Sequence, residues 1–505
     1  YKRNEERVHM NEQVLKMKIQ NIKGIKLLDF EFPLRSGIYA ITGENGSGKS
    51  TLISCASSVF YQMPMIEFFG RPENASINFI LNETTRSWEC NGKTWTSQSS
   101  KNRMKISGFY EGSIIFGNRF KDTNISTINK LDNLTKNDLE PAREFIYKNL
   151  GQILKNNEEF YKELFLVKKN SAKNIGLTRE AFCIKKAGNQ FISQPRMSTG
   201  ENLMLSILQS LEYVRKRRKK NDEYPCIVFL DEIELALHSS ALRRLVVFLK
   251  NIAEELELSI FFSTHSIDLL REIKAQNIYY LSSFWDNDIM VTNPCYPAYA
   301  TRNLYGDDGY GNDIVILVED DLAKLIIEKL LLEKQLVNNI RIKILPTGGW
   351  TNTITMAYDV TTSNLLQKGT KLAVVLDRDI KDEVPDFFST HKQYSGIKVD
   401  FLPIASLEKY LYSKLVRDKD KNLFILLDTY LFQKRPLLNI LNQYQKEVKV
   451  KDNDGKSLYG ILINEVKSMR KDRENLVEII VKYIIENEEQ SVRELSKYVI
   501  NKVKA

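Results

Sequence analysis

The feature that most constrains how this chain can fold is a glycine-rich loop placed between a strand and a helix. Residues 43–50 read GENGSGKS, which matches the pattern G-x-x-x-x-G-K-[ST]. The apolar run 37–42 before the loop predicts a strand, and we expect a helix to begin at Lys49. The glycines let the backbone wrap tightly, so that its amide N–H groups can face a phosphate. The loop therefore predicts an α/β domain that binds a nucleotide at the end of a strand.

Each residue type in this loop suits a nucleotide that carries a divalent cation. Lys49 supplies positive charge to the β- and γ-phosphates, and Ser50 offers a hydroxyl to Mg²⁺. The helix that follows presents the positive end of its dipole. We expect ATP to be bound by the set Asn45, Gly46, Ser47, Gly48, Lys49, Ser50 and Thr51.

A second motif combines a strand with two acids. Residues 226–230 are apolar throughout and lead directly into Asp231 and Glu232. Capping of the next helix by these acids is a poor explanation, because the strand before them is fully apolar. We expect Asp231 to hold Mg²⁺ through water and Glu232 to position the attacking water.

Two weaker motifs lie on either side of this strand. Residues 197–201 read MSTGE, which places Ser198 and Gly200 at the start of a helix, where anions bind well. An ordinary serine N-cap is the competing interpretation. His265 follows the apolar run 259–263, and a lone histidine in such a place is usually structural.

Together, the four motifs resemble the ATPase heads of the ABC and SMC families over about residues 14–280. The resemblance implies that Ser198, Gly200 and Glu201 address the nucleotide bound by a second copy, so that two heads pair head-to-tail. It also implies that His265 senses the γ-phosphate. The family's glutamine loop is not located by the sequence, and Gln62 is one candidate.

Further acids follow strand-like runs in the later part of the chain. Glu319 follows the run 314–318, and Asp377 and Asp379 follow the run 372–376. Acids at the carboxyl ends of parallel strands gather at one edge of a sheet. Carboxylates are the ligands that Mg²⁺ and Mn²⁺ prefer, so we expect these three acids to bind one of those ions.

Other residues nearby could complete this second site. Glu408 could serve a second metal position, and Lys409 or Lys414 could neutralise charge on a phosphate. The competing interpretation is that each acid caps a helix, and we prefer it for Asp320 and Asp321.

The second set resembles a Toprim domain, and an SMC-like ATPase followed by Toprim is the architecture of the OLD (overcoming lysogenization defect) family. Nuclease subunits of the Gabija defence system and some retron effectors share it. The resemblance covers about residues 14–415, although Asp320 stands where the family has a glycine. It implies an ATP-gated, metal-dependent DNA endonuclease of bacterial antiphage defence.

Two other functions stay open at this point. The chain could be an ATPase sensor or scaffold whose Toprim-like domain binds without cutting. It would then control a partner, such as the HNH nuclease of Septu systems, a helicase, or the reverse transcriptase of a retron with its nucleic acid. A repair ATPase of the RecF type is a third alternative, although a Toprim domain is not expected there.

We predict three domains from these patterns. Residues 1–295 form the ATPase head with a helical insertion at about 127–168, residues 312–420 form the Toprim-like α/β domain, and residues 421–505 form a helical region. Prolines and glycines among polar residues mark the boundary segment 294–312.

Composition narrows the setting of the protein. The net charge of +9 favours a nucleic-acid partner, although a lysine-rich genome explains it equally well. The basic run 215–220 could contact nucleic acid or simply end a helix. Five dispersed cysteines fit a reducing compartment, and the apolar runs are far shorter than the ~20 residues that span a bilayer. With no basic-then-apolar leader, we expect a cytoplasmic location.

Overall fold

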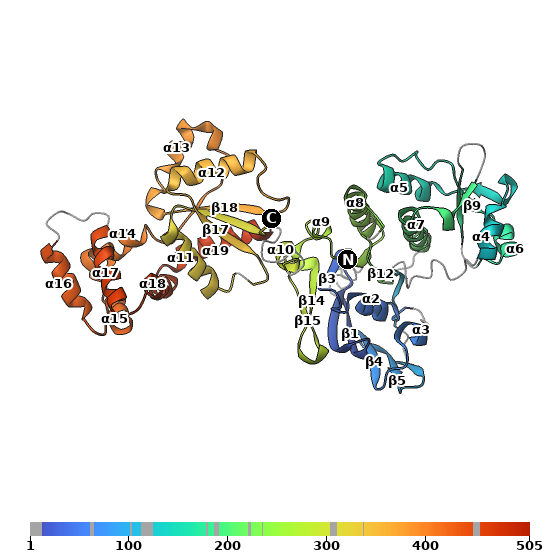
Figure 1. Cartoon of the computed structure of the whole chain (residues 1–505), viewed down its shortest axis with the longest axis horizontal. Helices are drawn as coiled ribbons and strands as arrows, with labels where there is room; N and C mark the ends of the chain where they lie inside the picture. The colour runs from blue at the N-terminus through green and yellow to red at the C-terminus, as the bar shows by residue number, and fades with distance from the viewer. Residues whose placement is uncertain are drawn as a thin grey trace, which may run out of the picture. The chain divides into compact units, whose positions relative to one another are not determined.

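The chain divides into two compact units, residues 1–304 and 305–505, and the division falls inside the segment 294–312 (Figure 1). This computed structural model describes residues 13–60, 65–100, 104–112, 125–177, 180–185, 191–220, 224–234, 236–302, 311–336, 338–447 and 455–504.

The centre of unit 1 is a six-stranded sheet in the order β15-β14-β3-β13-β12-β7. Its strands are parallel except for β15, which pairs antiparallel with β14. The strands β12 and β13 are buried along their whole length, as expected for a sheet that is covered on both faces. The bounds are β3 (Gly37–Gly43), β7 (Ser107–Glu111), β12 (Cys226–Leu230), β13 (Leu258–Ser263), β14 (Ile278–Ser283) and β15 (Ile289–Thr292).

Side chains alternate between two cores on the opposite faces of this sheet. Phe229 and Phe261 pack in one core with α2 (Lys49–Ser57). Val228 and Phe262 pack in the other core with α7 (Thr199–Arg218) and α8 (Ser239–Glu255). This period of two is the ordinary geometry of a strand, and it gives the sheet an apolar core on each of its faces. Shorter helices are α3 (Met65–Phe69), α9 (Ile267–Leu270) and α10 (Pro297–Ala300).

A second sheet of unit 1 is antiparallel, in the order β2-β1-β4-β5-β6. The alternating burial of β1 and β2 directs their apolar side chains into the core shared with α2. The bounds are β1 (Val14–Ile22), β2 (Ile25–Pro33), β4 (Ala75–Leu81), β5 (Thr84–Cys90) and β6 (Trp95–Ser99).

The insertion is not purely helical, and this prediction was wrong. Residues 127–168 contain the strands β8 (Leu139–Pro141) and β9 (Leu164–Val167), which join β10 and β11 in a four-stranded antiparallel sheet. Strands of three or four residues are too short to display a period of two, so the helical pattern around them dominated. The other elements are α4 (Ile125–Asp132), α5 (Glu144–Lys155), α6 (Lys169–Ile175), β10 (Phe182–Lys185) and β11 (Phe191–Ser193).

Unit 2 is built on a parallel four-stranded sheet in the order β17-β16-β18-β19. The middle strands β16 and β18 carry its apolar core together with α12. The bounds are β16 (Ile314–Val318), β17 (Ile342–Pro346), β18 (Lys371–Leu376), β19 (Asp400–Phe401), α11 (Asp321–Glu333), α12 (Trp350–Thr362), α13 (Val384–Thr390) and α14 (Leu407–Tyr412).

The later helices pack onto this α/β layer. The helix α17 contacts α14, α18 contacts α11, and α19 contacts β18. The region 421–504 is therefore joined to the sheet by direct packing within one compact unit. Its helices are α15 (Lys421–Tyr430), α16 (Leu437–Glu447), α17 (Lys456–Ser468), α18 (Arg473–Asn487) and α19 (Glu489–Lys504). Across the described parts of the chain, no helix combines the length and the apolar character needed to cross a membrane.

Candidate functional site

Three neighbouring parallel strands bring the predicted nucleotide residues to one edge of the unit 1 sheet. The glycine-rich loop follows β3, the acids follow β12, and the predicted switch histidine follows β13, which lies between them. Leu230 pairs in register with Phe262, and Ser263 pairs with Ile41, so the three strands end at the same level. Loops that are far apart in sequence therefore meet at one site, at the strand edge where open α/β sheets bind ligands.

The loop needs glycine where the backbone turns and where space is short. Gly46 and Gly48 have φ angles of 82° and 88°, which glycine adopts without strain. A side chain at Gly48 would lie 2.8 Å from the side chain of Ile25, and one at Gly43 would lie 2.2 Å from the carbonyl oxygen of Leu281. The loop is thus packed against its surroundings in a shape that other residues could not adopt. Asn45 and Ser47 lie in the loop, and Thr51 lies in the first turn of α2.

The ammonium of Lys49 is buried in this loop, and its hydrogen-bond acceptors among the described residues are neutral. Its Nζ donates to the carbonyl oxygens of Gly43 at 3.1 Å and of Glu44 at 2.8 Å. Burial lowers the pKa of Lys49 to about 8, although the nearby carboxylates of Asp231 and Glu232 oppose that change. A buried cation that has only neutral acceptors is suited to an incoming anion, so the site fits the phosphates of ATP.

Ser50 and Asp231, which we predict to hold a cation, lie in direct contact. The Ser50 hydroxyl donates to Asp231 Oδ1 at 3.1 Å, and the Ser263 hydroxyl donates to the same oxygen at 2.5 Å. Ser263 also accepts the backbone N–H of Glu232 at 2.8 Å. Burial raises the pKa of Asp231 and of Glu232, and nearby carboxylates raise that of Glu232 further. These acids would gain from a cation, so the set fits Mg²⁺ as well as the nucleotide.

Sequence reasoning missed one acid that connects the two loops. Glu234 Oε1 accepts the hydroxyl of Thr264 at 3.0 Å and the backbone N–H of His265 at 2.7 Å. Burial raises the pKa of Glu234 and lowers that of His265. The side-chain nitrogen Nδ1 of His265 is buried and has no hydrogen-bond partner within the described residues. The available signal was a third acid in the run 231–234, directly after the two that were assigned.

The predicted signature residues form a helix cap within their own subunit. Ser198 caps α7 in a capping box with Glu201: its Oγ accepts the backbone N–H of Glu201 at 3.3 Å, and its hydroxyl donates to Glu201 Oε2 at 2.8 Å. The hydroxyl of Tyr161, from the insertion, donates to Glu201 Oε1 at 2.7 Å. A side chain at Gly200 would lie 2.7 Å from the carbonyl oxygen of Ala236, so the start of α7 also packs against the loop after β12. The N-cap interpretation thus describes the contacts within one subunit.

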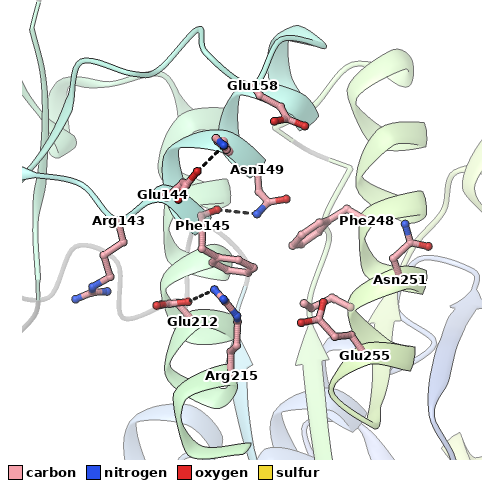
Figure 2. Close-up of a pocket in the computed structure, with 12 residues that line it drawn as sticks. Arg143, Glu144, Phe145, Asn149, Glu158, Glu212, Arg215, Phe248, Asn251 and Glu255 are labelled. Carbon is pink, nitrogen blue, oxygen red and sulfur yellow. Dashed lines mark hydrogen bonds and ion pairs between the residues drawn. The ribbon is translucent and has the colours of Figure 1, made fainter. Parts of the chain in front are cut away.

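The basic run 215–220 is largely engaged in local structure. Arg215 donates to Glu212 at 3.1 Å and lies over the ring of Phe145 at 4.9 Å, and Arg218 donates to the carbonyl oxygens of residues 256 and 257. Figure 2 shows Arg215 in the wall of a cavity of about 630 Å³, where α5 packs against α7 and α8. These contacts favour the helix-end interpretation for both arginines.

The two acids of unit 2 that end neighbouring strands are brought together. Glu319 follows β16 and Asp377 follows β18, and the backbone N–H of Asp377 donates to Glu319 Oε1 at 2.8 Å. Asp377 is 9% exposed, and its Oδ1 has no hydrogen-bond partner within the described residues. Burial raises the pKa of Asp377 to about 8, with further contributions from Glu319, Asp320, Asp379 and Glu408. Burial also raises the pKa of Glu319.

The remaining predicted residues of this site are arranged around the pair. Asp379 forms an ion pair with Lys409 at 2.6 Å. Asp320 caps α11, because its Oδ1 accepts the backbone N–H of Ala323 at 2.8 Å. Glu408 lies in the first turn of α14, while Lys414 pairs with Glu488 at 3.7 Å. Over the residues that the structure describes, no group of three or more acids, histidines or cysteines stands close enough to hold a metal ion as it is. Gln62, the candidate for the glutamine loop, lies outside those residues.

Comparison with known proteins identifies the first unit. The family described as AAA domain matches residues 16–278, just over half of the chain. No match was found among curated proteins. The match contains the glycine-rich loop, Asp231, Glu232 and His265.

Several solved structures resemble the chain at low sequence identity. An Smc head bound to the C-winged helix domain of ScpA is 15% identical over 55% of this chain and 96% of that one, with a TM-score of 0.38. The recombination mediator RecF bound to ATP is 14% identical over 56% and 98%, with a TM-score of 0.33. The SMC head domain from Thermotoga maritima is 14% identical over 56% and 99%, with a TM-score of 0.30.

Proposed function

The chain belongs to the AAA domain family, and on that premise we propose that it is an ATP-gated, divalent-metal-dependent DNA endonuclease of bacterial antiphage defence, similar to the OLD family. Unit 1 is the ATPase domain. In the proposal, unit 2 is a Toprim-like domain that cuts DNA. The observation that carries the nuclease is the pair of Glu319 and Asp377, held together at the ends of adjacent parallel strands. One buried carboxylate oxygen of Asp377 has no partner in the part of the chain that the structure describes.

The residues of unit 1 divide the work on ATP among themselves. Lys49 would hold the phosphates, Ser50 and Asp231 would hold Mg²⁺, and Glu232 would orient the attacking water. When bound, ATP supplies the phosphoanhydride bond, and Mg²⁺ partly neutralises the charge of the phosphates. Glu234 would position His265, because it accepts the backbone N–H of His265 and the hydroxyl of the preceding Thr264.

We further propose that two ATPase domains pair head-to-tail, with Ser198, Gly200 and Glu201 of one subunit facing the nucleotide of the other. In support, Ser198 begins a helix of 20 residues, whose N-terminus attracts anions. The Lys49→Ala protein and the Ser198→Asp protein should each be inactive. An aspartate at position 198 can still cap the helix, so the second change should preserve the fold. After mixing, half of the dimers would hold one intact site, so roughly a quarter of wild-type turnover should return. Failure of mixing to restore any turnover would exclude action between subunits.

In unit 2, the acids would hold the metal and the lysine would meet the phosphate. Glu319, Asp377 and Asp379 provide carboxylate oxygens, which suit Mg²⁺ or Mn²⁺, and Glu408 is available for a second position. Such ions, when bound, can activate a water and stabilise the leaving oxygen of a phosphodiester. Burial and then the neighbouring acids raise the pKa of Asp377, and a bound cation would offset both effects.

The nuclease is tested with purified full-length protein and supercoiled plasmid. We expect nicking in Mn²⁺ or Mg²⁺ that is abolished by Asp377→Ala and retained by Asp382→Ala, because Asp382 is an exposed acid in the same segment. The assay is run with and without ATP to detect gating. Equal nicking by wild type and Asp377→Ala would show that the activity does not come from this site.

One set of contacts favours a second function, an ATPase sensor or scaffold with a non-catalytic second unit. Lys409 is already paired with Asp379, and Asp320 occupies the position of the expected glycine as a helix cap. In that case the protein would control a separate nuclease, such as an HNH partner or a retron complex. Defence against phage by Asp377→Ala cells, together with no cutting by the pure protein, would favour this function over the first.

A further inference from the structure

The helical region of unit 2 makes a tight contact with the acidic site. Gly455 lies at the N-cap of α17 with a φ of 68°, and a side chain there would lie 2.2 Å from the carbonyl oxygen of Glu408 and 2.9 Å from Tyr412 Cβ. Only a residue without a side chain permits this approach. The first turn of α17 is therefore held directly against the first turn of α14, which carries both Glu408 and Lys409.

Tyr459 stands one helical turn beyond this contact. Its backbone N–H donates to the carbonyl oxygen of Gly455 at 2.9 Å, and residues four apart lie on the same face of a helix. The face of α17 that meets Glu408 thus continues to Tyr459. The charges around Tyr459 agree with this placement. The pKa of Tyr459 is raised to about 12, mainly by burial and also by Glu408 and Asp320, while Arg473 opposes them.

The hydroxyl of Tyr459 is buried and has no hydrogen-bond partner within the described residues. An unmade hydrogen bond of a buried hydroxyl costs free energy, so such a group usually serves a ligand or water that completes it. Because this hydroxyl keeps its proton at neutral pH, it is a donor. Asp377 Oδ1, in the same group of acids, is a buried acceptor that likewise has no partner among the described residues. The two open groups call for complementary ligands: a cation for the acid and an anion for the tyrosine.

We propose that Tyr459 donates a hydrogen bond to a phosphate oxygen of the nucleic-acid backbone bound with a divalent cation at the acidic site. This role rests on the proposed nuclease function, since that function brings a phosphate to these acids. The helical region then contributes directly to substrate binding, and Gly455 sets the position of the donor. A divalent cation held by these acids would offset the repulsion between their carboxylates and the phosphate.

Binding is measured by fluorescence anisotropy of a fluorescein-labelled DNA duplex with full-length protein in Ca²⁺, which occupies oxygen-rich sites. Tyr459→Phe removes only the hydroxyl. The matched control is Tyr483→Phe, since Tyr483 is another tyrosine of this unit, but its hydroxyl already donates to Asp420 Oδ2 at 2.5 Å. We expect roughly tenfold weaker binding for Tyr459→Phe and unchanged binding for Tyr483→Phe, because a hydrogen bond to a charged group of the ligand is lost in the first variant alone.

The outcomes separate this role from the nuclease itself. Nicking by the wild type with equal affinities for the two tyrosine variants would overturn the role of Tyr459 and leave the nuclease standing. If Asp377→Ala binds and nicks DNA as the wild type does, the acidic site is not the nuclease and the role of Tyr459 fails with it. A tenfold loss that persists in EDTA would place the hydroxyl in a contact that does not depend on the metal, and would also overturn the proposal.

Discussion

The two candidate sites share their geometry and differ in their charge. Each lies where parallel strands end, and in each a buried ionisable group has a pKa displaced to about 8. For Lys49 this is a fall from the ordinary value, and for Asp377 it is a rise. In both cases burial is the largest cause, but the neighbours act differently: the acids around Lys49 stabilise its charge, whereas those around Asp377 repel its charge. The same edge of a sheet can therefore favour an anion or a cation, depending on which sign of charge is left uncompensated.

The largest expected effect concerns the chemistry at the first site. Replacing Glu232 with Gln removes the carboxylate that orients the attacking water, so ATP turnover should fall by roughly 10²–10⁴-fold while ATP binding persists. Steady-state phosphate release and equilibrium binding of a labelled ATP measure the two quantities. Glu254→Gln, at an exposed position on α8, serves as the control. Undiminished turnover by Glu232→Gln would show that Glu232 takes no part in ATP hydrolysis.

The second effect tests whether Asp377 is held uncompensated. Its pKa is about 8 in the folded state and near the ordinary value of 3.8 when unfolded, so the folded state binds more protons between these values. The free energy of unfolding should therefore fall as the pH rises from about 4 through 8. Above pH 8 the full cost of burying the ionised carboxylate is present. Asp377→Asn cannot titrate, and it should stabilise unit 2 at pH 9 by an amount on the order of 2–5 kcal/mol.

Calorimetry of the full-length, metal-free protein follows this stability from pH 5 to 9. Asp382→Asn, a change at an exposed acid of the same segment, should retain the slope of the wild type. If the stability of the Asp377→Asn protein depends on pH as that of the wild type does, Asp377 is not an uncompensated charge and the contrast with Lys49 is wrong.

The third effect concerns Lys49, whose pKa is lowered where that of Asp377 is raised. Because the pKa of Lys49 is lowered to about 8, its ammonium loses the proton between pH 7 and 9, and ATP binding that needs this charge should weaken roughly tenfold. Fluorescent-nucleotide titrations across this range measure the slope. Lys49→Arg keeps its charge throughout and should give a flat profile, whatever its absolute affinity. A wild-type profile that is equally flat would mean that Lys49 does not titrate there.

The smallest effect distinguishes the two interpretations of Ser198. Ser198→Ala removes the cap of α7 and should cost about 1 kcal/mol of unfolding free energy. If Ser198 also faces the nucleotide of a second subunit, turnover should fall further than the loss of folded protein explains. Thermal denaturation and phosphate release on one preparation provide both numbers. Turnover that tracks the folded fraction alone would leave Ser198 as a helix cap.

The predictions from sequence succeeded where a motif fixes a local shape. The loop at residues 43–50 needs glycine at particular turns, and the strand, loop and helix around it follow as predicted. Ser50 and Asp231 also meet, because Ser50 lies in the first turn of the helix after the loop and Asp231 directly follows β12 at the same edge of the parallel sheet. The strands of the insertion were not visible, since three or four residues carry too little pattern. Glu234 was missed because its role is a contact with residues about 30 positions away.

The loop, the acids and the parallel sheet of the candidate nucleotide site can be read from the sequence alone, because a G-x-x-x-x-G-K-S turn and an acid-ended apolar strand restrict the local backbone. Which charged groups lack a charged partner among the described residues depends on the packing of the fold. The neutral acceptors of Lys49, the unpartnered oxygen of Asp377 and the approach of α17 to Glu408 all depend on packing between distant segments. Burial and the distances between charges set pKa values, and neither can be read from spacing along the chain.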